Sequence, residues 1–117
     1  MIELELPYPP TVNHYWGQRK CGGRYMGQKG LEFRKAVKVA CLSSGVSEPL
    51  TSALFVEIEV YPPDRRKRDL DNVLKATMDA LEHAEVFIDD YQVSGLHVER
   101  FEPINGGLMV IRISEID

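Results

Sequence analysis

Residues 54–84 have the sequence LFVEIEVYPPDRRKRDLDNVLKATMDALEHA, in which a strand pattern is followed by a helix pattern. In residues 54–61 apolar side chains alternate with glutamates, which is typical of a strand with one buried face, and two prolines then end it. From Asp71 to Ala84 apolar residues recur at steps of three and four, which predicts a helix with one buried side. The stretch therefore predicts a strand and a helix joined by a short, strongly basic connection.

Outward from this stretch, the same patterns predict further elements. Residues 2–6 alternate apolar and acidic side chains as a short strand does. Residues 13–30 contain five glycines and indicate a long irregular loop or a loose hairpin. A helical pattern then covers residues 31–44, with Gly45 as its expected stop.

Two apolar segments near the C-terminus, residues 93–101 and 108–113, are joined through the turn dipeptide Asn105-Gly106, which favours an antiparallel hairpin. The resulting order, β-loop-α-β-α-β-β, indicates an α+β fold of two layers, a mixed sheet with two main helices. A length of 117 residues and a hydrophobic content of 44% favour a single domain over residues 1–117.

Composition narrows the protein class. The N-terminus is acidic where a signal peptide would be basic, and no apolar run approaches the roughly 18–20 residues that span a membrane. Cys21 and Cys41 form no CxxC pair and the three histidines are scattered, so neither a disulfide framework nor a zinc site is indicated. We therefore expect a soluble protein of the reducing cytoplasm.

The formal net charge of −4 conceals an uneven distribution. Residues 1–68 carry eleven Lys or Arg against seven Asp or Glu, whereas residues 69–117 carry three against eleven. The asymmetry suggests a basic surface for a polyanion such as nucleic acid beside an acidic surface for cations. The alternative is that the asymmetry is incidental to a solvated surface.

Asp69 and Asp71 are spaced i, i+2 at the predicted junction between strand and helix. Side chains two residues apart converge in extended backbone but diverge in a helix, so only such a junction lets these two meet. Mg²⁺ takes oxygen ligands, usually one or two carboxylates together with water and substrate phosphate. The pair is therefore a candidate magnesium site, and the alternative is that both residues merely cap the helix.

Three groups of neighbours favour phosphate chemistry. Arg65, Arg66, Lys67 and Arg68 offer phosphate contacts directly before the aspartates, although elsewhere they would be an ordinary solvated patch. Lys75 lies one helical turn after Asp71 and could reach a phosphate, with an i, i+4 ion pair as its alternative role. Asp89-Asp90 is a second acidic pair, for which a simple turn is the alternative.

These residues resemble the RusA-type Holliday junction resolvases, the crossover junction endodeoxyribonucleases. The resemblance extends over nearly the whole chain and is carried by three segments: Pro9-Pro10-Thr11-Val12-Asn13, Pro63-Asp64-Arg65-Arg66-Lys67-Arg68-Asp69-Leu70-Asp71-Asn72 and Ile88-Asp89-Asp90-Tyr91-Gln92-Val93. One departure is that many members have glycine after the helix, where Ala84-Glu85 stands here. A glycine at that position would favour a left-handed helix C-cap on the path to Asp90.

The resemblance implies a Mg²⁺-dependent homodimer, with Mn²⁺ as a substitute, that binds four-way DNA junctions and nicks two opposing strands in recombination and repair. It implies that Asp69, Asp71 and Asp90 are catalytic metal ligands and that Lys75 is important for cleavage. It also implies DNA contacts from the basic run and, as weaker candidates, from the basic loop: Arg65, Arg66, Lys67, Arg68, Arg19, Lys20, Arg24 and Lys29.

Two other functions fit the same residues. The first is a metal-dependent nuclease for flaps, single strands or RNA, because the acidic residues alone do not select the substrate. The second is a non-catalytic nucleic-acid-binding module in which the aspartates only cap the helix and orient the basic loop.

Overall fold

A computed structural model describes residues 1–11, 15–18 and 24–116, with the backbone alone described at 16–18 and 24–25. Its elements, in chain order, are β1 (Ile2–Leu6), β2 (Trp16–Gln18), β3 (Arg24–Met26), α2 (Gln28–Ser43), β4 (Leu54–Tyr61), α3 (Leu70–His83), the 3-10 turn η1 (Asp90–Gln92), β5 (Val93–Arg100) and β6 (Leu108–Glu115).

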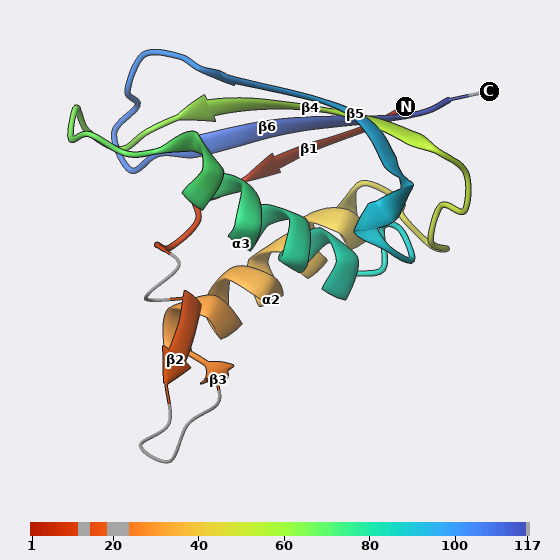
Figure 1. The fold of residues 1–117 in the computed structure, drawn as a ribbon, viewed down its shortest axis with the longest axis horizontal. Coiled ribbons are helices and arrows are strands. Elements are labelled where there is room, and N and C mark those ends of the chain that lie inside the picture. Colours follow the sequence, from red (N-terminus) through yellow and green to blue (C-terminus); the bar gives the residue numbers. More distant parts are fainter. Residues whose placement is uncertain (12–14, 19–23, 117) are drawn as a thin grey trace.

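Two helices lie on one face of a four-stranded sheet (Figure 1). The strand order is β1-β6-β4-β5, with β4 parallel to β5 and antiparallel to β6. The α+β class, the mixed sheet and the two main helices are therefore confirmed. The short pair β2 and β3 is antiparallel, so the described part of residues 13–30 contains the loose hairpin.

The predicted hairpin between the last two strands is wrong, because β4 lies between β5 and β6. Alternate residues of β4 are fully buried, which suits a strand paired on both edges, whereas β5 has no fully buried side chain among its described residues and forms an edge. The connection after β5 returns along the end of β4, where the Phe101 amide donates to the Val60 carbonyl at 2.8 Å. Local turn chemistry at Asn105-Gly106 was therefore a poor guide to strand pairing.

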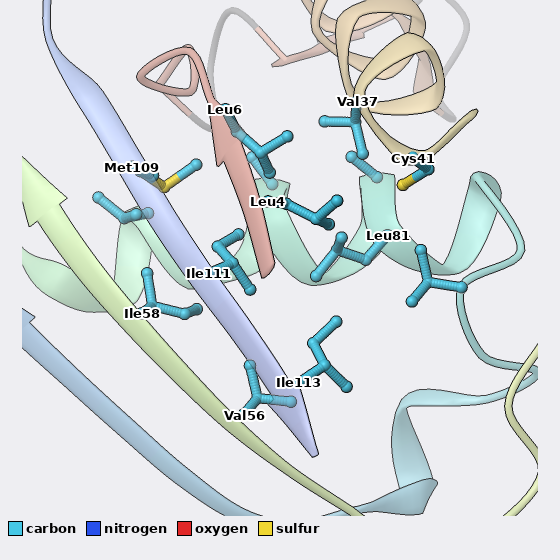
Figure 2. Packing of buried hydrophobic residues seen from close by; sticks show 14 of the residues in the cluster. Leu4, Leu6, Val37, Cys41, Val56, Ile58, Leu81, Met109, Ile111 and Ile113 are labelled. Atoms are coloured by element: carbon cyan, nitrogen blue, oxygen red, sulfur yellow. The ribbon is translucent and has the colours of Figure 1, made fainter. Parts of the chain in front are cut away.

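The core lies between the sheet and the helices (Figure 2). Every second residue of β4 and β6 points into it, so the period-two pattern of the sequence becomes the packing surface. The helices contribute their apolar stripes from the other side. Fully buried core side chains include Leu4, Leu6, Val37, Val56, Ile58, Leu81, Met109, Ile111 and Ile113.

Helix α2 begins three residues before the predicted start, at Gln28. The glycine count assigned Gly30 to the loop, but Gly30 lies inside α2 and is buried. The residue at this position must be small. A Cβ at this position would stand 2.3 Å from the Tyr15 carbonyl oxygen, so only glycine lets the preceding chain pass so close. Within the described residues, no helix is long and apolar enough to cross a membrane.

Candidate active site

Asp69 and Asp71 lie at the junction where the sequence placed them. Asp69 is the N-cap residue of α3 in extended backbone, and Asp71 belongs to the first helical turn. Within the described chain the Asp69 side chain makes no capping hydrogen bond to the helix, and both side chains are exposed. The capping alternative therefore does not account for the Asp69 carboxylate, which remains available to a ligand.

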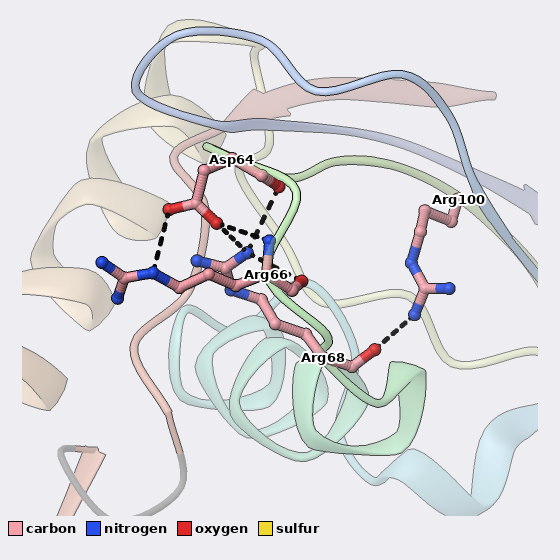
Figure 3. A network of polar contacts seen from close by, with 4 residues as sticks. All are labelled: Asp64, Arg66, Arg68 and Arg100. Carbon is pink, nitrogen blue, oxygen red and sulfur yellow. Dashed lines mark hydrogen bonds and ion pairs between the residues drawn. The ribbon is translucent and has the colours of Figure 1, made fainter.

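The basic run before α3 is organised by Asp64 (Figure 3). The Asp64 carboxylate accepts hydrogen bonds from the Arg66 backbone amide at 2.9 Å and from the Arg68 guanidinium at 2.7 Å. These two bonds lower the pKa of Asp64 to about 2, with the Arg68 contact the larger cause. The Asp64 carboxylate therefore ties the backbone of the loop to the Arg68 side chain.

Arg68 connects this loop to the rest of the fold. Its backbone carbonyl accepts a hydrogen bond from Arg100 of β5 (Figure 3). Its guanidinium carbon lies 5.7 Å from the ring centre of Tyr8, a cation–π contact, and burial raises the pKa of the Tyr8 hydroxyl. The segment after β1 is thereby held against the start of α3.

One cavity borders Asp69, and a second borders the basic run. The first, of about 300 Å³, is lined by Asp69 and Asn72 together with residues 8–11 and 67–68. The other, of about 530 Å³, is lined by the whole basic run and Arg100. In the part of the chain that the structure describes, no carboxylate pairs with Lys67, whereas Arg65 pairs with Glu102 at 2.9 Å on the exposed rim. The second cavity, which we call the basic groove, offers a cationic surface suited to a phosphate backbone.

The remaining predicted cations lie farther out. Lys75 is exposed on α3, one turn beyond Asp71. Lys29 is exposed at the start of α2 and lines a cavity with Tyr8, across the segment that borders Asp69. Arg24 belongs to β3 by its backbone, and its side chain is outside the described residues. Arg19 and Lys20 also lie outside the described residues.

Asp90 lies at the opposite end of α3 from Asp69 and Asp71. It begins η1, and its backbone amide donates to a carboxylate oxygen of Glu82, near the C-terminus of α3, at 3.2 Å. Asp89 caps the turn by accepting from the Tyr91 amide at 2.9 Å, so the turn role holds for Asp89. One copy of the chain therefore does not bring the three predicted ligands together.

Glu82 was missed from the sequence. Its carboxylate, with those of Asp89 and Asp90, forms the only group of three potential ligands within 4.8 Å of one another among the described residues. Such oxygen donors suit a hard divalent cation. The three residues come from a helix end and a separate turn, so only the folded chain reveals the grouping.

The path to Asp90 is preserved despite the missing glycine. Glu85 adopts a left-handed backbone with φ 62°, as a glycine would, and the Val86 amide donates to the Leu81 carbonyl at 3.2 Å to close the helix. With Glu85 in this conformation, the chain turns after α3 without a glycine, at a cost in backbone strain.

The sequence is similar to known proteins over nearly its whole length. Residues 7–114 match the family model described as Endodeoxyribonuclease RusA. The chain is 37% identical over 115 residues to the crossover junction endodeoxyribonuclease rusA of Enterobacteria phage HK97, covering 98% of this chain and 95% of the relative. It is 34% identical over 117 residues to RusA of Escherichia coli strain K12, covering 97% and 93%. On this evidence the chain belongs to the RusA family of endodeoxyribonucleases.

Proposed function

We propose that the protein is a divalent-metal-dependent endodeoxyribonuclease that resolves four-way DNA junctions by paired nicks in opposing strands. Its relatives are crossover junction endodeoxyribonucleases by name. The observation that carries the proposal is the position of Asp69, whose carboxylate starts α3 without capping it and borders a cavity together with Lys67 and Arg68. A candidate ligand and cations for the DNA backbone thus share one surface.

The carboxylates of Asp69, Asp71 and Asp90 would hold Mg²⁺, or Mn²⁺ in its place, since all three offer hard oxygen donors. When bound, the metal would activate a water molecule and stabilise the departing oxygen of the phosphodiester. Lys75 stands one turn from Asp71 and would neutralise negative charge that develops on the phosphate.

The basic groove would hold the DNA backbone. Arg65, Arg66, Lys67 and Arg68 contact phosphates, so their contribution to affinity is insensitive to base sequence and decreases as salt rises. A homodimer with two-fold symmetry would offer one site to each of the two opposing strands that are cut.

The proposal is tested by incubating the purified protein with an end-labelled four-way junction and with a linear duplex of the same sequence, each with Mg²⁺, with Mn²⁺ and with EDTA. We expect cutting of the junction in both metals, little cutting of the duplex and none in EDTA. Metal-dependent cutting of flaps or single strands in preference to the junction would support the other nuclease, and the absence of any metal-dependent cutting would overturn the proposal.

A further inference from the structure

The cavity beside Asp69 has walls of a kind that a phosphate backbone does not need. Its volume is about 300 Å³, and the apolar part of its lining comes from Tyr8, Pro9, Pro10 and Val73. That size is at the lower end of the range for sites that hold small organic molecules, roughly 300–1,000 Å³. Phosphates bind to cationic and polar groups, so the apolar walls suit a different part of the nucleic acid.

Tyr8 and Arg68 give this cavity two planar groups. The Arg68 guanidinium carbon lies 5.7 Å from the centre of the Tyr8 ring, and both residues line the cavity. Proteins hold bases outside a helix by stacking them on aromatic rings and on guanidinium planes. The lining therefore matches the flat, partly apolar shape of a nucleobase.

Both planar groups are held in place by the fold itself. The Arg68 guanidinium donates to the Asp64 carboxylate at 2.7 Å (Figure 3). A Cβ at Gly107 would stand 2.7 Å from the Tyr8 Cβ, so this glycine lets the chain before β6 pack directly against Tyr8. A base that enters the cavity would therefore meet side chains that are already ordered, which lowers the entropic cost of binding.

The rim of the cavity has groups that suit the rest of a nucleotide. The exposed side chains of Asn72 and Lys67 make no hydrogen bond within the part of the chain that the structure describes. The Asn72 amide offers one donor and one acceptor side by side, as the edge of a base requires, and Lys67 offers a cation to a phosphate. Asp69 borders the same cavity, so a base inside it would bring its own phosphate close to this candidate metal ligand.

A base reaches such a cavity only after it leaves its stack. Extruding a base from a duplex costs unpairing and unstacking energy, and the cost is least for a base that is mismatched or already unpaired. Where four arms meet, the stack of base pairs is interrupted, so a base at the branch point is displaced at lower cost than one in a linear duplex. The cavity would consequently be filled more readily by a branched substrate.

We propose that the cavity beside Asp69 binds one nucleobase displaced from the branch point, next to the phosphate that is cut. Tyr8 and Arg68 stack on the base, and Asn72 hydrogen-bonds to its edge. Asp69 and Lys67 face its phosphate. This inference rests on the proposed function, because it concerns the same site. It adds a source of selectivity, since the basic groove binds any DNA backbone whereas the cavity takes a base that a linear duplex does not release.

The test compares two changes that break the same base pair. The cut position is first mapped on the intact junction. An abasic nucleotide then replaces either a base that flanks the cut phosphate or the pairing partner of that base, at both two-fold related positions. The first change removes the base that the cavity would bind, and the second leaves that base present and unpaired. A junction with an abasic nucleotide in the middle of an arm is the control for damage elsewhere.

For one of the two bases that flank the cut, we expect its removal to slow cutting at least about tenfold, whereas removal of its partner leaves cutting at least as fast as in the intact junction. Tyr8→Phe retains the ring and should keep this difference, and Tyr8→Leu should cut both abasic junctions at equal rates. Circular dichroism checks that both variants fold.

Equal rates of the wild type on the two abasic junctions, on both sides of the cut, would overturn the nucleobase site. A folded Tyr8→Leu protein that still distinguishes them would overturn the stacking role of Tyr8.

The two proposals fail in different ways. If the wild type cuts the intact junction and treats the two abasic junctions alike, the proposed function stands and the nucleobase site is wrong. If the wild type cuts nothing, the proposed function is wrong. Gel-shift affinities for the same pairs of junctions, with the abasic nucleotide at each branch-point base in turn, then still decide whether a displaced base is bound.

Discussion

Asp64 is an acidic residue that orders the basic run beside it. Its carboxylate accepts hydrogen bonds from the Arg66 amide and the Arg68 guanidinium and so fixes the loop (Figure 3). It removes part of the positive charge that DNA would meet, and it holds the remaining charge in one geometry. The ion pair is exposed enough that its net effect on stability is small, so its role is to order the loop.

The pKa of Asp64 gives a direct prediction. Its value of about 2 lies below the ordinary 3.8, so the contact with Arg68 is fully present above about pH 4 and is lost as the pH falls through about 2. A carbon-detected NMR titration of the carboxyl group should show this low midpoint in the wild type. In Arg68→Ala the midpoint should move up toward the ordinary value, and an unchanged midpoint would show that the contact is not formed in solution.

Lys67 has no ion pair within the described structure, so it can bind a phosphate of DNA without first giving up another partner. Lys67→Ala should weaken junction binding and reduce the slope of log affinity against log salt by about one. Gel-shift titrations at several salt concentrations measure it. Lys38→Ala, an exposed lysine on α2, should leave the slope unchanged, and equal slopes for all three proteins would remove Lys67 from the interface.

At the scale of elements, the sequence predicted most element boundaries correctly and one strand pairing wrongly. The strand over 54–61 and the helix over 71–84 were found within a residue, because alternation and three-to-four spacing are local properties of chains that bury one face. The pairing of β5 and β6 failed because the choice of neighbour depends on which strand the core buries most, and that is settled only by the whole sheet.

The candidate site was predicted to a similar extent. The position of Asp69 and Asp71 at the start of a helix follows from local pattern, and the structure agrees. Glu82 was not predictable, because its partner Asp90 joins it through a turn whose course depends on the left-handed backbone at Glu85. The separation of Asp90 from Asp71 was equally hidden, since sequence motifs carry no distance between distant segments.

The helix stop at Glu85 yields a stability prediction. A residue with a Cβ at φ 62° is strained, so Glu85→Gly should raise the free energy of unfolding by roughly 1 kcal/mol. Gly45, at φ 82° after α2, is the matched control, and Gly45→Ala should lower it by a similar amount. Urea denaturation measures both. If Glu85→Gly destabilises the protein, the side chain of Glu85 contributes more than the strain costs.

At the scale of the whole molecule, charged groups of opposite sign lie at the two ends of α3. The basic run precedes its first turn, and Glu82, Asp89 and Asp90 lie close together at its C-terminal end. We expect the two-fold dimer proposed above to bury exposed apolar side chains such as that of Tyr91.

Tyr91 tests the proposed dimer. Tyr91→Ser removes a 90% exposed aromatic side chain and should shift the protein toward monomer at micromolar concentration, with cutting reduced in proportion. Sedimentation velocity gives the mass and circular dichroism checks the fold. Leu42→Ser, at a 66% exposed position on α2, should change neither mass nor cutting. A fully dimeric Tyr91→Ser protein would place the interface elsewhere.

The central claim is that the carboxylates at the start of α3 cut the junction that the basic groove binds. The direct measurement compares wild type with Asp71→Asn for junction affinity and for cutting in Mg²⁺. We predict that the variant binds at least as tightly, because a negative charge is removed near the phosphates, and that its cutting rate decreases by a factor of about 10² or more. A variant that cuts at the wild-type rate would contradict the account.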